Sequence, residues 1–182
     1  MIQKIKNYFA RYQFLQELAK VNRRRAAVNL NEAKNIGIVY MVYSEETYKM
    51  AEAFVKTLKT KERYIHILGY VPLKYIPPYI IPTLATDYFT RKDVNWLGKP
   101  VNTYVTDFLK RDFDIVINLC MEENYTLQYI SGLSRASFKV GIAGENHTDY
   151  YDFMIEVKAG IPLDDYMKEI IHYLKIINIK NV

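Results

Sequence analysis

The stretch that decides the fold is "NIGIVYMVY", residues 35–43. This continuous apolar run is too short and too rich in β-branched residues for a helix, and it is typical of a strand buried on both faces of a parallel sheet. The segment that follows, 44–60, predicts a helix, because Ser44 can cap its start, acidic residues fill its first turn and lysines its last. A second apolar run, "RYIHILGYV" (63–71), completes a strand–helix–strand unit.

The same alternation continues to the end of the sequence. Further strands are expected near 84–90 and at 114–120, 137–142 and 151–157, and further helices at 101–110, at 124–134 and from Pro162 onward. We therefore predict a three-layer, Rossmann-like α/β domain over 35–182, with a mostly parallel sheet in the strand order 3-2-1-4-5-6. A basic amphipathic helix and its connector, residues 1–34, precede this domain.

Residues 72–100 interrupt this alternation of strands and helices, and they contain five of the six prolines and several aromatic residues. Long irregular segments in compact domains are often flaps or binding loops. A proline-stiffened cover over one edge of the sheet is the alternative, and we favour it.

The positive charge is concentrated in the N-terminal arm. Residues 1–34 carry eight basic and two acidic residues, which leaves 17 basic and 18 acidic residues for the rest of the chain. Because the body of the domain has no basic surplus, nucleic-acid binding is disfavoured. The residues most available to an acidic partner or a membrane surface are Lys4, Arg11, Arg23, Arg24 and Arg25.

The N-terminal helix also carries an apolar face, at Ile2, Ile5, Phe9, Tyr12, Leu15 and Leu18 with Ala19. This face can pack on the chain's own domain or on a second copy in a homodimer, and it can also lie on a membrane or a partner. We expect it to pack.

One cysteine, Cys120, excludes an internal disulfide, which fits a reducing compartment. The sequence has no apolar run of transmembrane length, and charges interrupt its first twenty residues, so no signal peptide is expected. We therefore expect a cytoplasmic protein without a transmembrane segment.

In the expected strand order, the strands ending at Tyr43 and Cys120 are neighbours where the order reverses, and ligands of such folds bind there. The side chains expected at this crevice are Ser44, Glu45, Asn118, Cys120 and Glu122. The acidic residues would repel phosphate, and neither a G-x-G-x-x-G nor a Walker pattern occurs, so no nucleotide cofactor is predicted. A cationic ligand or a divalent metal would fit these acidic residues better. The alternative is that they only complement the dipoles of the nearby helices, and we favour this alternative.

Cys120 could act as a nucleophile if His66 or His147 supplied a base, but an inert buried thiol is the interpretation we prefer. The segment "GIAGENHTDYYD" (141–152) contains side chains that could bind a metal. A solvated turn has the same composition, and we favour this interpretation. The residues in question are Glu145, His147, Asp149 and Asp152. We predict no metal site.

The block "FDIVINLCMEENYTLQYISGLSRASFKVGI" (113–142) resembles two families. Together with "NIGIVY", "HILGYV", "DVNWLGKP" and "YDFMI", it resembles a domain-of-unknown-function family of small bacterial α/β proteins, over nearly the whole chain. That resemblance implies a fold and no activity. The block alone is similar to the N-terminal half of heptosyltransferase-like glycosyltransferases. Their glycine-rich loop after the first strand is absent from "VYSEET", and there is no room for their second domain, so only the fold is implied.

From these features we predict a non-enzymatic or degenerate binding domain whose partner the sequence does not name. A small enzyme that uses the crevice is the first alternative. An adaptor that binds membrane or nucleic acid through its basic arm is the second.

Overall fold

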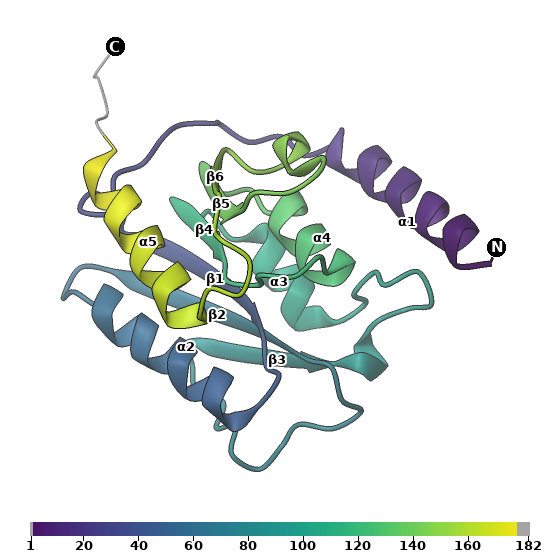
Figure 1. The fold of residues 1–182 in the computed structure, drawn as a ribbon, viewed down its shortest axis with the longest axis horizontal. Coiled ribbons are helices and arrows are strands. Elements are labelled where there is room, and N and C mark those ends of the chain that lie inside the picture. Colours follow the sequence, from purple (N-terminus) through teal and green to yellow (C-terminus); the bar gives the residue numbers. More distant parts are fainter. Residues whose placement is uncertain (1, 178–182) are drawn as a thin grey trace.

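The computed structural model describes the backbone of residues 2–177 and the side chains of residues 5–177. Its centre is a six-stranded, all-parallel sheet in the order β3-β2-β1-β4-β5-β6 (Figure 1). The predicted strand order is therefore confirmed. The strands are β1 (Asn35–Met41), β2 (Tyr64–Val71), β3 (Thr86–Thr90), β4 (Ile115–Asn118), β5 (Phe138–Ile142) and β6 (Phe153–Ile155).

Helices cover both faces of the sheet, so the predicted three-layer architecture is confirmed. On one face lie α2 (Glu45–Leu58) and α5 (Leu163–Ile176), and on the other lie α3 (Thr103–Lys110) and α4 (Tyr125–Leu133). A further helix, α1 (Ile2–Leu18), packs on the outside of α4 (Figure 1). Two short 3₁₀ turns, Arg91–Asp93 and His147–Asp149, lie in the loops.

The central strands are buried on both faces, as the apolar runs predict. Every residue of β1 except the first is buried, and Ile36 pairs directly with Ile115 of β4. Gly37 leaves room for aromatic rings, because a Cβ there would lie 2.8 Å from Phe108 Cζ. The expected caps also form: Ser44 Oγ accepts the backbone N–H of Thr47, and Asn124 Oδ1 accepts that of Leu127.

The N-terminal helix packs on the domain through a different face from the one predicted. Ala10 and Phe14 are buried against α4, whereas most of the expected face is exposed, including Phe9 at 52% and Tyr12 at 56%. Of the expected residues, Leu18 is partly buried in the same cluster as Phe14, and the side chain of Ile2 lies outside the described residues. The reason lies on α4. Gly132 leaves a hollow that the Phe14 ring fills, since a Cβ on Gly132 would lie 2.5 Å from Phe14 Cζ.

Polar contacts hold the same face of α1 in place. The Tyr125 hydroxyl donates to the Ala10 carbonyl oxygen at 2.7 Å, and the Tyr129 hydroxyl donates to the Glu17 carboxylate. The connector then crosses to the other side of the sheet (Figure 1). There Leu30 is buried, and its backbone N–H donates to the Leu174 carbonyl oxygen at 2.8 Å.

No helix among the described residues is long and apolar enough to cross a membrane.

Candidate functional site

A crevice of about 370 Å³ opens at the carboxyl ends of β1 and β4, where the strand order reverses. Four elements wall it: the ends of β1 and β4, the first turns of α2 and the start of α5. Met41 and Cys120 come from the strand ends, Met50 from α2 and Leu163 from α5. The full lining is Tyr40, Met41, Tyr43, Glu46, Thr47, Met50, Leu119, Cys120, Met121, Glu122, Pro162 and Leu163.

A crevice lies at the edge of the sheet that the sequence indicates, and only some of the expected residues line it. Of the five expected residues, Cys120 and Glu122 line the crevice, and Ser44, Glu45 and Asn118 do not. Ser44 is occupied as the cap of α2, and Glu45 forms an ion pair with Lys49 at 2.7 Å.

Asn118 is an internal support. Its side-chain amide donates to the Tyr151 hydroxyl at 2.7 Å, and its Oδ1 accepts the backbone N–H of Cys120 at 2.9 Å. The Tyr166 hydroxyl donates to its carbonyl oxygen at 3.2 Å. These bonds tie the end of β4 to the loop before β6 and to α5, so Asn118 shapes the wall behind the crevice.

The thiol of Cys120 is positioned as a buried hydrogen-bond donor. It is 5% exposed, and Sγ lies 3.3 Å from the Glu122 carbonyl oxygen. Burial raises the pKa of this thiol, so the thiolate is disfavoured. Neither candidate base is hydrogen-bonded to it. His66 pairs with Asp87 at 2.9 Å, and His147 Nδ1 lies 2.8 Å from the Ile142 carbonyl oxygen.

Two carboxylates stand at the rim of the crevice. Glu122 accepts a hydrogen bond from the Tyr43 hydroxyl at 3.1 Å, and both side chains are exposed. Burial of part of its ring raises the pKa of Tyr43, and the nearby Cys120 and Glu122 raise it further. Glu46 belongs to the first turn of α2, and among the described residues it forms no ion pair. The rim therefore carries negative charge above an apolar floor.

The segment 141–152 is tied into the fold by its own side chains. His147 is 4% exposed and its Nε2 lies 3.1 Å from Gln128 Nε2, while Asp149 forms an ion pair with Arg11 at 3.2 Å. Asp152 accepts two hydrogen bonds of 2.7 Å from Arg23. Among the described residues, no group of three or more His, Cys, Asp or Glu is arranged to hold a metal.

The basic residues expected to bind a partner occupy different environments. The side chain of Arg23 is only 5% exposed and also donates to the carbonyl oxygens of residues 136 and 137, so it stabilises the interior. Arg24 and Arg25 are exposed, and Arg25 Nε lies 3.8 Å from Asp152 Oδ1. Arg11 forms an ion pair with Asp149. The side chain of Lys4 lies outside the described residues.

A parallel sheet between two helical layers, with a crevice where its strand order reverses, defines a Rossmann-like α/β domain. The chain belongs to a family of unknown function, DUF6913, whose model matches residues 6–177. No match was found among curated proteins or among solved structures. The resemblance to heptosyltransferase-like glycosyltransferases stays a prediction.

Proposed function

We propose that this protein is a non-enzymatic binding domain whose crevice takes a small, mostly apolar ligand that carries a cationic amine. The observation that supports this proposal best is the composition of the crevice: an apolar floor beneath two rim carboxylates, at the edge where ligands of this fold class bind. Its volume of about 370 Å³ suits a compact ligand.

The apolar part of the ligand is expected from the floor. Met41, Met50 and Met121 surround the crevice together with Leu119 and Leu163. Methionine side chains are flexible and polarizable, so they adapt to flat or irregular apolar ligands and contact aromatic rings favourably. Such a floor suits a phenyl or similar ring better than a sugar.

The cationic part is expected from the rim. Glu46 and Glu122 line the crevice from different elements, since Glu46 lies in the first turn of α2 and Glu122 follows β4. An ammonium between them would gain two partners, each worth about 0.5–1 kcal/mol at an exposed site. Phosphate would be repelled, which argues against a nucleotide ligand.

Binding is favoured over catalysis by the state of Cys120. Its raised thiol pKa and its hydrogen bond to a carbonyl oxygen hold it in the protonated, weakly nucleophilic form. A small enzyme that uses this crevice is the alternative outcome of the same experiments. It would be supported by covalent labelling of Cys120 in the native protein.

Matched aromatic probes test the proposal. Phenethylamine, 2-phenylethanol and 3-phenylpropionate share a ring and differ in charge, so the amine should raise the melting temperature most and shift NMR signals of residues 41–50 and 119–122. Glu46→Gln should weaken amine binding severalfold. Glu45→Gln removes the same charge one residue away, outside the crevice, and should leave binding unchanged. Equal binding of the three probes would contradict the charge argument, and binding of none would contradict the site.

A second proposal concerns α1. We propose that its exposed stripe pairs with the same stripe of a second copy in a homodimer. The stripe consists of Ile5 (51% exposed), Tyr8 (69%), Phe9 (52%), Tyr12 (56%) and Leu15 (37%). Contiguous exposed apolar patches commonly mark interaction surfaces.

The area of the stripe limits the strength of such a dimer. Five large side chains, each about half exposed, offer on the order of 450 Å² per copy, so two copies would bury about 900 Å². This total lies at the weak end of specific interfaces. Analytical ultracentrifugation should therefore detect a dimer only at high concentration, and Phe9→Asp should abolish it. Arg24→Asp, on the exposed connector, is the control. A monomer at all concentrations that sediments with anionic vesicles would favour a membrane instead.

We also propose the cytoplasm of a bacterium as the location of this protein. A buried free thiol supports a reducing compartment, and the bacterial assignment rests on the sequence resemblance alone.

A further inference from the structure

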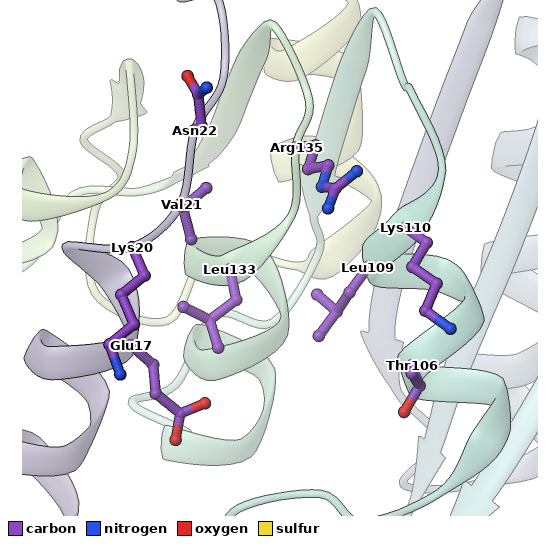
Figure 2. Close-up of a pocket in the computed structure, with 9 residues that line it drawn as sticks. All are labelled: Glu17, Lys20, Val21, Asn22, Thr106, Leu109, Lys110, Leu133 and Arg135. Carbon is purple, nitrogen blue, oxygen red and sulfur yellow. The ribbon is translucent and has the colours of Figure 1, made fainter.

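A second and larger hollow, of about 730 Å³, lies near the opposite edge of the sheet, between the ends of α1, α3 and α4 (Figure 2). We call it the basic pocket. Its lining is Glu17, Lys20, Val21, Asn22, Thr106, Leu109, Lys110, Leu133 and Arg135. Lys20 and Lys110 stand on opposite sides in Figure 2, with Leu133 and Leu109 between them and Arg135 above Leu109.

The three cations of the basic pocket have no anionic partner among the described residues. Lys20, Lys110 and Arg135 are exposed and form no ion pair or side-chain hydrogen bond there. Other arginines of the chain behave differently. Arg63 donates to the carbonyl oxygens of Ala33 and Leu58, at 2.9 and 2.6 Å, and thereby satisfies main-chain acceptors before β1 and at the end of α2. The basic pocket therefore concentrates charge that the fold itself does not use.

Glu17, the one acidic residue of the lining, does not balance this charge. Its carboxylate accepts hydrogen bonds from Lys99 Nζ at 2.7 Å and from the Tyr129 hydroxyl. Burial acts to raise the pKa of Glu17, but these hydrogen bonds outweigh it, so the pKa lies below its ordinary value and the group stays ionised. Because Lys99 already neutralises Glu17, the net charge at the pocket is that of the three free cations.

The helix ends explain why three cations tolerate one another here. A helix C-terminus carries partial negative charge, and α1, α3 and α4 all end at this pocket. This compensation is partial, at about half a charge per helix, so positive charge remains. Between the cations, half-buried Val21, Leu109 and Leu133 form an apolar floor.

We propose that the basic pocket binds an amphiphilic phosphate, that is, a phosphate monoester attached to a short apolar chain. The phosphate carries close to two negative charges and offers oxygens to both lysine and arginine donors. The apolar chain covers the leucine and valine floor. A soluble metabolite and a lipid headgroup share this chemistry. The site is separate from the crevice and does not depend on the function proposed for it.

Short-chain lipids below their micellar concentration test the proposal by calorimetry. Dihexanoyl phosphatidic acid should bind saturably and tighter than inorganic phosphate, whereas the zwitterionic dihexanoyl phosphatidylcholine should bind far more weakly. The variant Lys110→Gln/Arg135→Gln should lose about tenfold or more in affinity, because it removes two cationic groups that would donate hydrogen bonds to the phosphate. The variant Lys56→Gln/Lys61→Gln removes the same charge from exposed positions elsewhere and should stay within about twofold.

Vesicles distinguish the two sources of the phosphate. Sedimentation with phosphatidylcholine vesicles only when they contain phosphatidic acid would assign the pocket to a lipid surface. Binding of the soluble probe alone would assign it to a metabolite. Circular dichroism confirms that both variants are folded. The proposal is overturned if no anionic probe binds saturably, if phosphatidylcholine binds as well as phosphatidic acid, or if the control variant loses as much affinity as the pocket variant.

Discussion

Replacing Lys139 by methionine should change how the stability of this domain depends on pH. Lys139 lies in β5 and is 1% exposed, and its Nζ donates to the Gly132 carbonyl oxygen. Burial and, to a lesser degree, the charge of Arg23 lower the pKa of this amine, the charge of Asp152 opposes them, and the resulting pKa is about 7. A lysine with this pKa is half neutral at neutral pH, whereas an exposed lysine stays charged.

The sign and the size of the effect follow from linkage. In the unfolded chain the same amine has a pKa of about 10.4. Between the two pKa values the unfolded state binds more protons than the folded state, so the free energy of unfolding rises with pH. With a folded pKa of about 7, this single group raises the free energy of unfolding by about 3 kcal/mol as the pH increases from about 7 to about 9.5.

Urea unfolding of the wild type and of Lys139→Met at these two pH values isolates the contribution. Tyrosines and other groups that titrate in the same range are common to both proteins and cancel in the difference. The wild type should gain about 3 kcal/mol relative to the variant on raising the pH. Parallel curves, with a relative change below about 0.5 kcal/mol, would show that the amine stays charged and solvated, and would refute the argument from burial.

Three further predictions concern packing and burial. Gly132→Ala should destabilise the domain by about 1–3 kcal/mol, although alanine favours a helix more than glycine does, because the new Cβ meets the Phe14 ring. Adding Phe14→Leu to this variant should restore part of the loss, as measured by urea titration. Asp152→Asn should cost about 3–5 kcal/mol, since it leaves Arg23 buried without its anion, whereas Arg11→Gln at the exposed pair should cost under about 1 kcal/mol. Native Cys120 should react with Ellman's reagent at least about tenfold more slowly than the urea-unfolded chain.

The sheet could be predicted because its signals are local and repeated. Each buried strand is a short apolar run, and each helix that follows begins with a capping residue such as Ser44 or Asn124. Handedness and short connections then leave few orders for six parallel strands, and the observed order is the expected one. Pairing of Ile36 with Ile115 follows directly from that order.

The docking of α1 could not be predicted, because the deciding feature lies on another element. Helical periodicity selects the face of Phe9 and Tyr12, which is the more apolar one. The structure uses the face of Phe14 because Gly132 leaves a hollow for its ring and because Tyr125 and Tyr129 supply hydrogen bonds. A single sequence shows the glycine but not which side chain fills the space.

The structure has a crevice at the edge where the sequence places a ligand site, but its lining differs in part from the expected one. Strand ends fix the position of Cys120 and Glu122, which do line it. Asn118 faces inward instead, and its amide is used by Tyr151. Met50 and Leu163 reach the crevice because α2 and α5 cover the same face of the sheet, and the sequence does not reveal how closely those helices approach.

The charged residues of both proposed sites complement the dipoles of nearby helices. Acidic residues at the start of α2 and after β4 give the crevice a negative rim, and lysine or arginine near the ends of α1, α3 and α4 gives the basic pocket its positive charge. Each set of charges complements the nearby helix ends, yet each leaves groups without partners among the described residues. The crevice and the basic pocket thus present opposite charge to solvent. A cationic ligand and an anionic ligand would therefore not compete, and saturating the crevice with an amine should leave phosphate binding at the basic pocket unchanged.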